Sequence, residues 1–246
     1  MNLLSKILHT TLPMEDIGQH NGDRRVAWVE KALKSIPAGS TILDAGAGEL
    51  YFKKYCGHLH YTSQDFNQYD GKGNEGEHWG HWDTSQIDIV SDITAIPVPD
   101  ASFDAIMCCE VFEHIPEPAK AIKEFSRILK PGGTLISTAP FCSLTHQAPY
   151  YFANGFSRYW YEKIFAENDL GIQELKMNGN FFNFIAQEIR RIPLMEKAYT
   201  DVSLSSKLLY KVAVRILLSF IYQMDKHDKN SSEMSCFSIL VSAKKK

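Results

Sequence analysis

Apolar residues recur along the chain in a pattern that is typical of strands alternating with helices. Several short runs are continuously apolar, as parallel strands that are covered on both faces require. The predicted strands are residues 41–45, 60–65, 87–91, 103–109, 133–139, 172–177 and 236–243. This alternation indicates βαβ units and predicts an α/β fold, a doubly wound, seven-stranded and mostly parallel sheet.

Helical spacing of apolar residues marks the segments between the strands. Residues 23–36 and 157–168 are predicted helices, and a third begins at Pro118 and ends before Pro131. Between the last two strands, residues 181–233 are predicted to form a mainly helical insertion.

Composition excludes several classes of protein. The chain has 246 residues and a formal net charge of -3, and its one run of basic residues, the last three lysines, is too short to bind a nucleic-acid backbone, so we expect no nucleic-acid partner. Five cysteines without a C-x-x-C pair, and an N-terminus unlike a signal peptide, favour a reduced, cytoplasmic location. His78 and His81 are too few ligands for a metal site, and we predict none.

The turn after the first predicted strand carries the main chemical signal. Residues 44–48 read Asp-Ala-Gly-Ala-Gly. Ligands of open α/β sheets bind beyond the carboxyl ends of the strands, and glycines at 46 and 48 let the backbone approach a ligand closely. Asp65 ends the next strand about 20 residues on, the spacing at which a carboxylate reaches ribose hydroxyls.

The charge of this turn separates two nucleoside ligands. A dinucleotide fingerprint would have glycine where this chain has Tyr51, and the Asp44 carboxylate would repel a pyrophosphate. S-adenosylmethionine carries an ammonium and a sulfonium group and no phosphate. The sequence therefore predicts S-adenosylmethionine as the cofactor, with a nicotinamide-dependent oxidoreductase as a weaker alternative.

Four blocks of sequence strengthen this prediction. In order they are TILDAGAGEL, YTSQDFN, VSDITAIPVPDASFDAIMCCEVFEHI and LKPGGTLISTAP. Together they resemble the class I methyltransferases, particularly the group known as methyltransferase type 11. The resemblance covers roughly residues 22–175 and the last strand, and implies a Rossmann-like methyltransferase fold and methyl transfer.

The resemblance implies roles for the residues of the first two blocks. Gly46 and Gly48 would pass beneath the methionyl part and the ribose, Asp65 would accept hydrogen bonds from the ribose hydroxyls, and Phe66 would line the cofactor site. Asp44 would hold the glycine turn or the ammonium group of the cofactor. The alternative is that Asp44 and Asp65 only form turns or cap helices.

The third block adds further cofactor contacts by resemblance. Asp92 would lie beside the adenine amino group, Ile93 would donate a backbone N–H to the ring, and Glu110 would touch the methionyl end. Asp92 could instead be a plain turn residue. Leu50 replaces a third glycine of the family, so we expect the helix after the turn to sit differently.

Two histidines are candidates for acid–base catalysis. Imidazole titrates near neutral pH, so His114 and His146 could accept a proton from a hydroxyl during methyl transfer. A structural or hydrogen-bonding role is the alternative for each. The resemblance therefore implies a methyltransferase for a small-molecule, sugar or lipid-like acceptor, with a catalytically silent, methyltransferase-like binding subunit as the alternative.

The predicted domain organisation is a single methyltransferase domain over residues 1–246. It comprises an N-terminal extension (1–21), a cofactor-binding core (22–180), the helical insertion (181–233) and the last strand with a basic tail (234–246).

The insertion contains a broad apolar stripe over residues 207–224. Lys211 and Arg215 lie inside it, and each would cost roughly 2.5–3.5 kcal/mol at a bilayer centre, so we predict no transmembrane span. A homodimer through residues 181–233 and shallow contact with a membrane surface both stay open.

Overall fold

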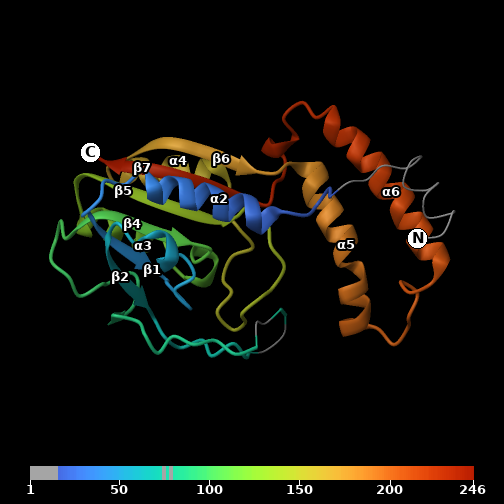
Figure 1. The fold of residues 1–246 in the computed structure, drawn as a ribbon, viewed down its shortest axis with the longest axis horizontal. Helices are drawn as coiled ribbons and strands as arrows, with labels where there is room; N and C mark the ends of the chain where they lie inside the picture. The colour runs from blue at the N-terminus through green and yellow to red at the C-terminus, as the bar shows by residue number, and fades with distance from the viewer. Residues whose placement is uncertain (1–15, 74–75, 78–79) are drawn as a thin grey trace. The chain divides into compact units, whose positions relative to one another are not determined.

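The computed structural model describes residues 16–73, 76–77 and 80–246 (Figure 1). Most of the predicted N-terminal extension, residues 1–15, lies outside the described residues. His78, which was considered as a metal ligand, lies outside them as well.

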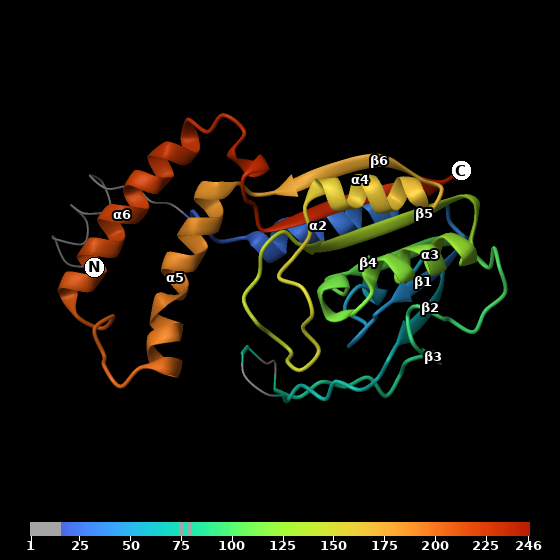
Figure 2. The same cartoon turned by 180° about the vertical axis from the view of Figure 1, so that it is seen from behind.

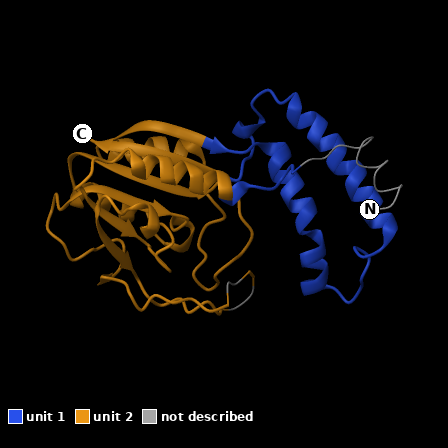
Figure 3. Cartoon of the chain, in the orientation of Figure 1, with its two compact units in different colours: residues 1–22, 177–237 blue, residues 23–176, 238–246 orange. Residues whose placement is uncertain are grey.

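The described chain forms two compact units (Figure 3). The described residues within 23–176 and 238–246 make up the larger one, and residues 16–22 and 177–237 make up the smaller one. The organisation as a single domain, expected from the sequence, stays a prediction.

The sheet has seven strands in the order β3-β2-β1-β4-β5-β7-β6. Its strands are β1 (Thr41–Ala45), β2 (His60–Asp65), β3 (Ile89–Val90), β4 (Phe103–Cys109), β5 (Leu129–Pro140), β6 (Leu170–Asn178) and β7 (Ser238–Lys245). The first five pair in parallel, and β7 pairs with β5 in the antiparallel direction. This arrangement confirms the predicted α/β fold and its mostly parallel sheet.

Helices cover both faces of this sheet. Figure 1 shows α2 (Asn21–Lys34) on one face, and Figure 2 shows α3 (Pro118–Ile128) and α4 (Arg158–Glu167) on the other. The apolar side of α2 packs on the sheet, where Leu33 shares a buried cluster with Ile42 of β1. Burial on both faces explains why the central strands are continuously apolar.

The segment after the glycine turn differs from the expectation of a helix in a shifted position. It forms only a 3₁₀ turn, η1 (Lys53–Tyr55). Leu50, which replaces the third glycine, has a φ of 60°. The chain therefore keeps the left-handed backbone that suits glycine, although an L-residue there costs about 1–2 kcal/mol.

The smaller unit is mainly helical, which confirms the predicted insertion before the last strand. It contains α5 (Phe181–Tyr199), α6 (Leu208–Lys226) and the 3₁₀ turn η3 (Ser231–Glu233). Ile17, Ala186, Leu218, Ile221 and Tyr222 form its buried core. Among the helices that the structure describes, none has the length and apolar character needed to cross a membrane.

Candidate active site

The glycine turn follows β1 and is held against β2. The backbone N–H groups of Gly46 and Ala47 donate to the Gln64 carbonyl at 2.8 and 2.9 Å. Gly46 has a φ of 73°, and a Cβ there would lie 2.5 Å from Val111 Cγ2. Glycine is therefore required both by the backbone and by the space around it.

Trp82 packs on the second glycine of the turn. A Cβ on Gly48 would lie 2.7 Å from Trp82 Cζ2, and the Trp82 ring meets Tyr69 edge to face at 5.8 Å. The next backbone N–H, from Asp83, donates to Glu49 Oε1 at 3.2 Å. The segment around Trp82 thus covers the turn.

Asp44 lies buried at the end of β1. The Tyr61 hydroxyl donates to Asp44 Oδ2 at 2.6 Å. Burial raises the pKa of Asp44 to about 7, the hydrogen bond from Tyr61 opposes this, and the charge of Asp65 adds to it. Asp44 can therefore gain or lose a proton near neutral pH.

Asp65 braces the glycine turn. Its Oδ2 accepts from the Gly48 N–H and its Oδ1 from the Asn67 N–H, both at 2.9 Å. These bonds are those of a turn former, the alternative considered from the sequence. A carboxylate has about four acceptor sites, so both oxygens retain capacity for ribose hydroxyls.

The residues expected around the adenine lie at the ends of β2 and β3. The Phe66 ring meets Tyr150 edge to face at 4.9 Å. Asp92 is exposed, and its Oδ1 accepts from Thr94 N and Oγ1, both at 2.8 Å, which is a turn interaction. Ile93 is buried.

Glu110 follows β4 with a φ of 56°, an uncommon conformation that the surroundings must stabilise. Arg25 of α2 donates to its Oε2 and the Thr138 hydroxyl to its Oε1, each at 2.8 Å. The carboxylate is therefore fixed at the carboxyl ends of β4 and β5. Sequence reasoning missed Arg25, because no local motif links it to Glu110.

The two candidate histidines lie together although 32 positions separate them, since their rings are 4.7 Å apart. His114 Nδ1 is bonded to the Tyr150 carbonyl and His146 Nδ1 to the Leu144 carbonyl at 2.8 Å. The two Nε2 atoms lie 3.8 and 3.9 Å from Oε1 of Glu113. Burial lowers the pKa of His114 to about 4, so this imidazole is neutral at physiological pH.

Glu113 was missed by the sequence reasoning. Its side chain is 1% exposed, and burial raises its pKa well above the ordinary value, with the charge of Glu110 adding to this. The motif Phe-Glu-His-Ile contains it next to His114, so adjacency to a candidate catalytic residue was the signal available.

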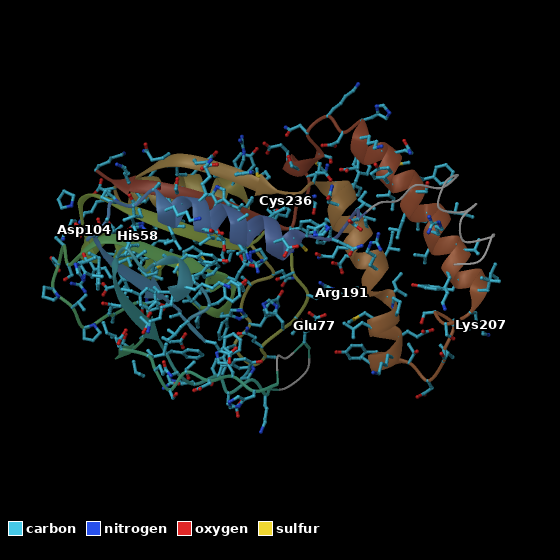
Figure 4. All side chains as sticks on the ribbon, viewed as in Figure 1. His58, Glu77, Asp104, Arg191, Lys207 and Cys236 are labelled. Atoms are coloured by element: carbon cyan, nitrogen blue, oxygen red, sulfur yellow. The ribbon has the colours of Figure 1, made fainter. Side chains whose placement is uncertain are left out.

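Asp104 lies at the opposite end of the sheet from the candidate site and has a structural role. Figure 4 shows Asp104 and His58 near the amino ends of the strands, and Glu77 beyond the carboxyl ends. Asp104 Oδ2 accepts from the Thr41 N–H at 2.9 Å, and Lys130 donates to its Oδ1 at 2.8 Å. The hydrogen bond from Lys130, with those from Thr41, lowers the pKa of Asp104 to about 2.

Comparison with known protein families shows which family the sequence around this site matches. The family model described as Methyltransferase domain matches residues 43–137, which run from β1 into β5 and include the glycine turn, Asp65 and Glu110. These residues match a methyltransferase domain. The resemblance to the class I methyltransferases is thereby confirmed.

Curated relatives of the methyltransferase domain match over short segments. Ubiquinone biosynthesis O-methyltransferase of Xanthomonas oryzae pv. oryzae is 38% identical over 68 residues, which are 28% of this chain and 26% of the relative. The 2-methyl-6-phytyl-1,4-hydroquinone methyltransferase of Synechocystis sp. is 30% identical over 109 residues, 42% of this chain and 33% of the relative. The matches thus span a quarter to a third of the relatives' length.

Solved structures share the fold of the methyltransferase domain at low identity. The geranyl diphosphate C-methyltransferase of Streptomyces coelicolor A3(2) has a TM-score of 0.52 and 13% identity, with 92% of this chain and 79% of that chain covered. The [4+2]-cyclase SpnF has a TM-score of 0.53 and 17% identity, with coverages of 89% and 80%. A fold shared by proteins with such different names does not by itself define an activity.

Proposed function

We propose that this protein transfers a methyl group from S-adenosylmethionine to a small-molecule acceptor. The observation that carries the proposal is the meeting of a glycine turn with Asp65 and Glu110 at the carboxyl ends of β1, β2 and β4. Parallel α/β sheets bind their ligands at this edge. A cationic nucleoside complements the carboxylates there, of which Glu110 is paired with Arg25 and Asp65 has no cationic partner among the described residues.

The donor set fits S-adenosylmethionine. Gly46 and Gly48 add no side chain to the turn, on which Val111 and Trp82 pack, and Asp65 retains lone pairs for the two ribose hydroxyls. Asp92 and the N–H of Ile93 would serve the adenine. When bound, the cofactor supplies an electrophilic methyl group on its sulfonium.

The methionyl end would meet two further acidic residues. Glu110, fixed by Arg25, would face the ammonium group directly, and Asp44 would act through the turn or through water. Binding of a cation beside Asp44 would favour its ionised form, so cofactor uptake would release a proton near pH 7.

His114 and His146 are proposed to handle the proton of the acceptor. The Nδ1–H groups are directed to backbone carbonyls, which leaves an unprotonated Nε2 on each ring. Such a nitrogen can accept a proton from a hydroxyl as the methyl group is transferred, although the lowered pKa of His114 makes that imidazole a weak base.

The acceptor is proposed to enter beside the loop of residues 140–156. This loop carries His146 and the aromatic residues Tyr150 and Tyr151, which suit a flat or apolar acceptor. The names of the relatives include ubiquinone and a hydroquinone, small molecules of this kind. A sugar or another lipid-like acceptor would use the same hydroxyl chemistry.

Calorimetry tests the cofactor assignment. We expect the wild-type protein to bind S-adenosylmethionine and its demethylated product and not NADH, and Asp65→Ala to weaken that binding at least tenfold. Asp100→Asn is the matched control, because it removes a carboxylate from an exposed loop elsewhere and should leave the affinity unchanged. Binding of NADH alone would overturn the proposal.

A catalytically silent binding subunit is the second candidate, because a fold shared with a protein named for a different reaction does not by itself define an activity. Incubation with methyl-labelled cofactor and fractionated cell extract separates the two. A labelled small product supports methyl transfer, whereas tight cofactor binding with no turnover in any fraction supports the binding subunit.

Two contacts of the smaller unit stay predictions. On α6, Leu208, Leu209 and Phe220 are 68%, 81% and 59% exposed. A homodimer through residues 181–233 would show in analytical ultracentrifugation, and shallow membrane contact would show as flotation with anionic vesicles. Replacing Leu209 by Ser should weaken whichever contact is formed.

A further inference from the structure

We propose that Glu113, His114 and His146 form a binding site for one divalent transition-metal ion of the zinc class. Oε1 of Glu113 and a nitrogen of each histidine lie within 4.8 Å of one another. The proposal rests on the proposed function only for its use: a fourth position on the ion would take the acceptor's hydroxyl oxygen.

The hydrogen bonds of the histidines favour this interpretation. Each Nδ1 is bonded to a backbone carbonyl, which fixes the tautomer with the proton on Nδ1 and the lone pair on Nε2. Metal-binding histidines characteristically donate their other ring N–H in this way, because the bond orients the ring and raises its basicity. Here both rings do so, and both lone pairs are on the side of Glu113.

The Glu113 side chain is the second observation. It is 1% exposed, and among the described residues its Oε2 has no hydrogen-bond partner. A buried carboxyl oxygen without a partner is costly, by about 1–3 kcal/mol or more. The distances of 3.8 and 3.9 Å from Oε1 to the histidine nitrogens are too long for hydrogen bonds.

A bound cation would make this unfavourable arrangement of side chains favourable. Two lone pairs and a carboxylate oxygen facing one another repel, whereas a divalent ion between them attracts all three. Bonds of about 2.0–2.1 Å in tetrahedral geometry place ligand atoms about 3.4 Å apart. The two separations between Glu113 Oε1 and the histidine nitrogens therefore need to shorten by roughly half an ångström, which small side-chain rotations provide.

The backbone around the three residues is well supported. Glu113 and His114 belong to the 3₁₀ turn η2 (Phe112–His114), and the Glu113 carbonyl accepts from the Phe152 N–H at 2.8 Å. Glu77 forms a parallel bridge with His146, in which the Gln147 N–H donates to the Glu77 carbonyl at 2.9 Å. Both halves of the cluster are thus fixed before any ion arrives.

The ligand set indicates the kind of metal. Two imidazoles and one carboxylate suit Zn²⁺ or Co²⁺, whereas Mg²⁺ and Ca²⁺ prefer oxygen ligands alone. Three protein ligands are typical of catalytic zinc sites, which keep one position open. With both Nε2 lone pairs bound to the ion, the histidines would not act as bases. The ion would instead lower the pKa of a bound hydroxyl, so that the proton leaves to solvent before the oxygen attacks the methyl group.

The test is a titration of the untagged, full-length protein with Zn²⁺, in the absence of S-adenosylmethionine and of any acceptor. We expect one ion per chain by calorimetry, a visible absorption spectrum with Co²⁺ that reports nitrogen and oxygen ligands, and no comparable binding of Mg²⁺. His146→Ala and Glu113→Gln should each weaken Zn²⁺ binding at least 100-fold.

His60→Ala is the matched control, because His60 is exposed at the start of β2 and should not change the affinity. S-adenosylmethionine affinity and thermal unfolding show whether each variant is folded, and they test the proposed function separately. No stoichiometric Zn²⁺ binding by a folded wild-type protein, or equal loss in the control and in His146→Ala, would overturn the proposal.

Discussion

Asp44 and Glu113 are two buried acidic residues in the larger unit, 3% and 1% exposed, and burial raises the pKa of both. Asp44 accepts a hydrogen bond from Tyr61 at 2.6 Å. Glu113 has an oxygen without a partner among the described residues and faces two imidazole nitrogens. The fold supplies a donor to one buried carboxyl, whereas it leaves an oxygen of the other without one among the described residues, and it is at the second that we propose a metal ion.

The largest predicted effect in the comparison of Asp44 with Glu113 is the pH dependence of stability that Asp44 causes. The folded-state pKa of Asp44 is about 7 against an ordinary 3.8, so the folded chain binds this proton more tightly. The contribution of Asp44 to the free energy of unfolding is therefore fully present below about pH 4 and is lost as the pH rises to about 7. At 1.36 kcal/mol per pKa unit, it approaches about 4 kcal/mol.

Urea unfolding measures this contribution when wild-type protein and Asp44→Asn are compared between about pH 4.5 and about pH 7.5, a range that covers most of the pH window in which the contribution is lost. The difference between the two proteins should shift in favour of the variant as the pH rises. A constant difference over this range would show that Asp44 is already ionised in the folded protein.

Zinc should reverse the effect of changing Glu113. Without metal, we expect Glu113→Gln to be at least as stable as wild type, because a neutral amide costs less to bury than a carboxylate. With Zn²⁺ at 100 times its Kd, wild type should gain about 2.7 kcal/mol and the variant almost nothing. Thermal unfolding in chelator and in zinc gives both values, and the same ranking in both buffers would contradict the comparison.

Removing the Tyr61 hydroxyl should make Asp44 resemble Glu113. Tyr61→Phe leaves the Asp44 carboxyl without its donor, which should cost about 1–3 kcal/mol at pH 8, where Asp44 is ionised. The cost should be smaller at pH 5. Tyr159→Phe is the control, since Tyr159 is 64% exposed; equal losses in the two variants would mean that the bond to Asp44 contributes nothing.

The smallest effect concerns the turn beside Asp44 and touches neither carboxyl. Leu50→Gly should be more stable than Leu50→Ala by about 1 kcal/mol, because both lose the same packing and only glycine relieves the positive φ. Chemical unfolding of the pair measures the difference. Equal stability would show that the left-handed conformation of residue 50 is not strained.

Much of the fold could be predicted from the sequence. The bounds of β1 and β2 agree with the prediction, since a central parallel strand needs an apolar run and ends at polar or glycine residues. β5 begins at Leu129, four residues before its predicted start, because it follows α3 without a break. β3 has only two paired residues, at the sheet edge, where the apolar pattern gives little guidance.

The candidate site also has a part that the sequence predicts and a part that it does not. The glycine turn and Asp65 follow from local spacing, because both lie at strand ends in consecutive βα units. The pairing of Arg25 with Glu110, and of His146 with Glu113, depends on how distant segments pack. Helix spacing and strand alternation do not encode that packing, so these partners needed the structure.

The place where the helical insertion leaves the sheet determines how well the fold tolerates changes in the length of the insertion. The Phe237 N–H donates to the Asn178 carbonyl at 2.9 Å, so the intervening chain departs and returns through adjacent positions. Loop-closure entropy grows slowly with length, by about 0.6 kcal/mol per doubling. Lengthening, shortening or exchanging the chain between these two residues is therefore compatible with an unchanged strand order in the sheet.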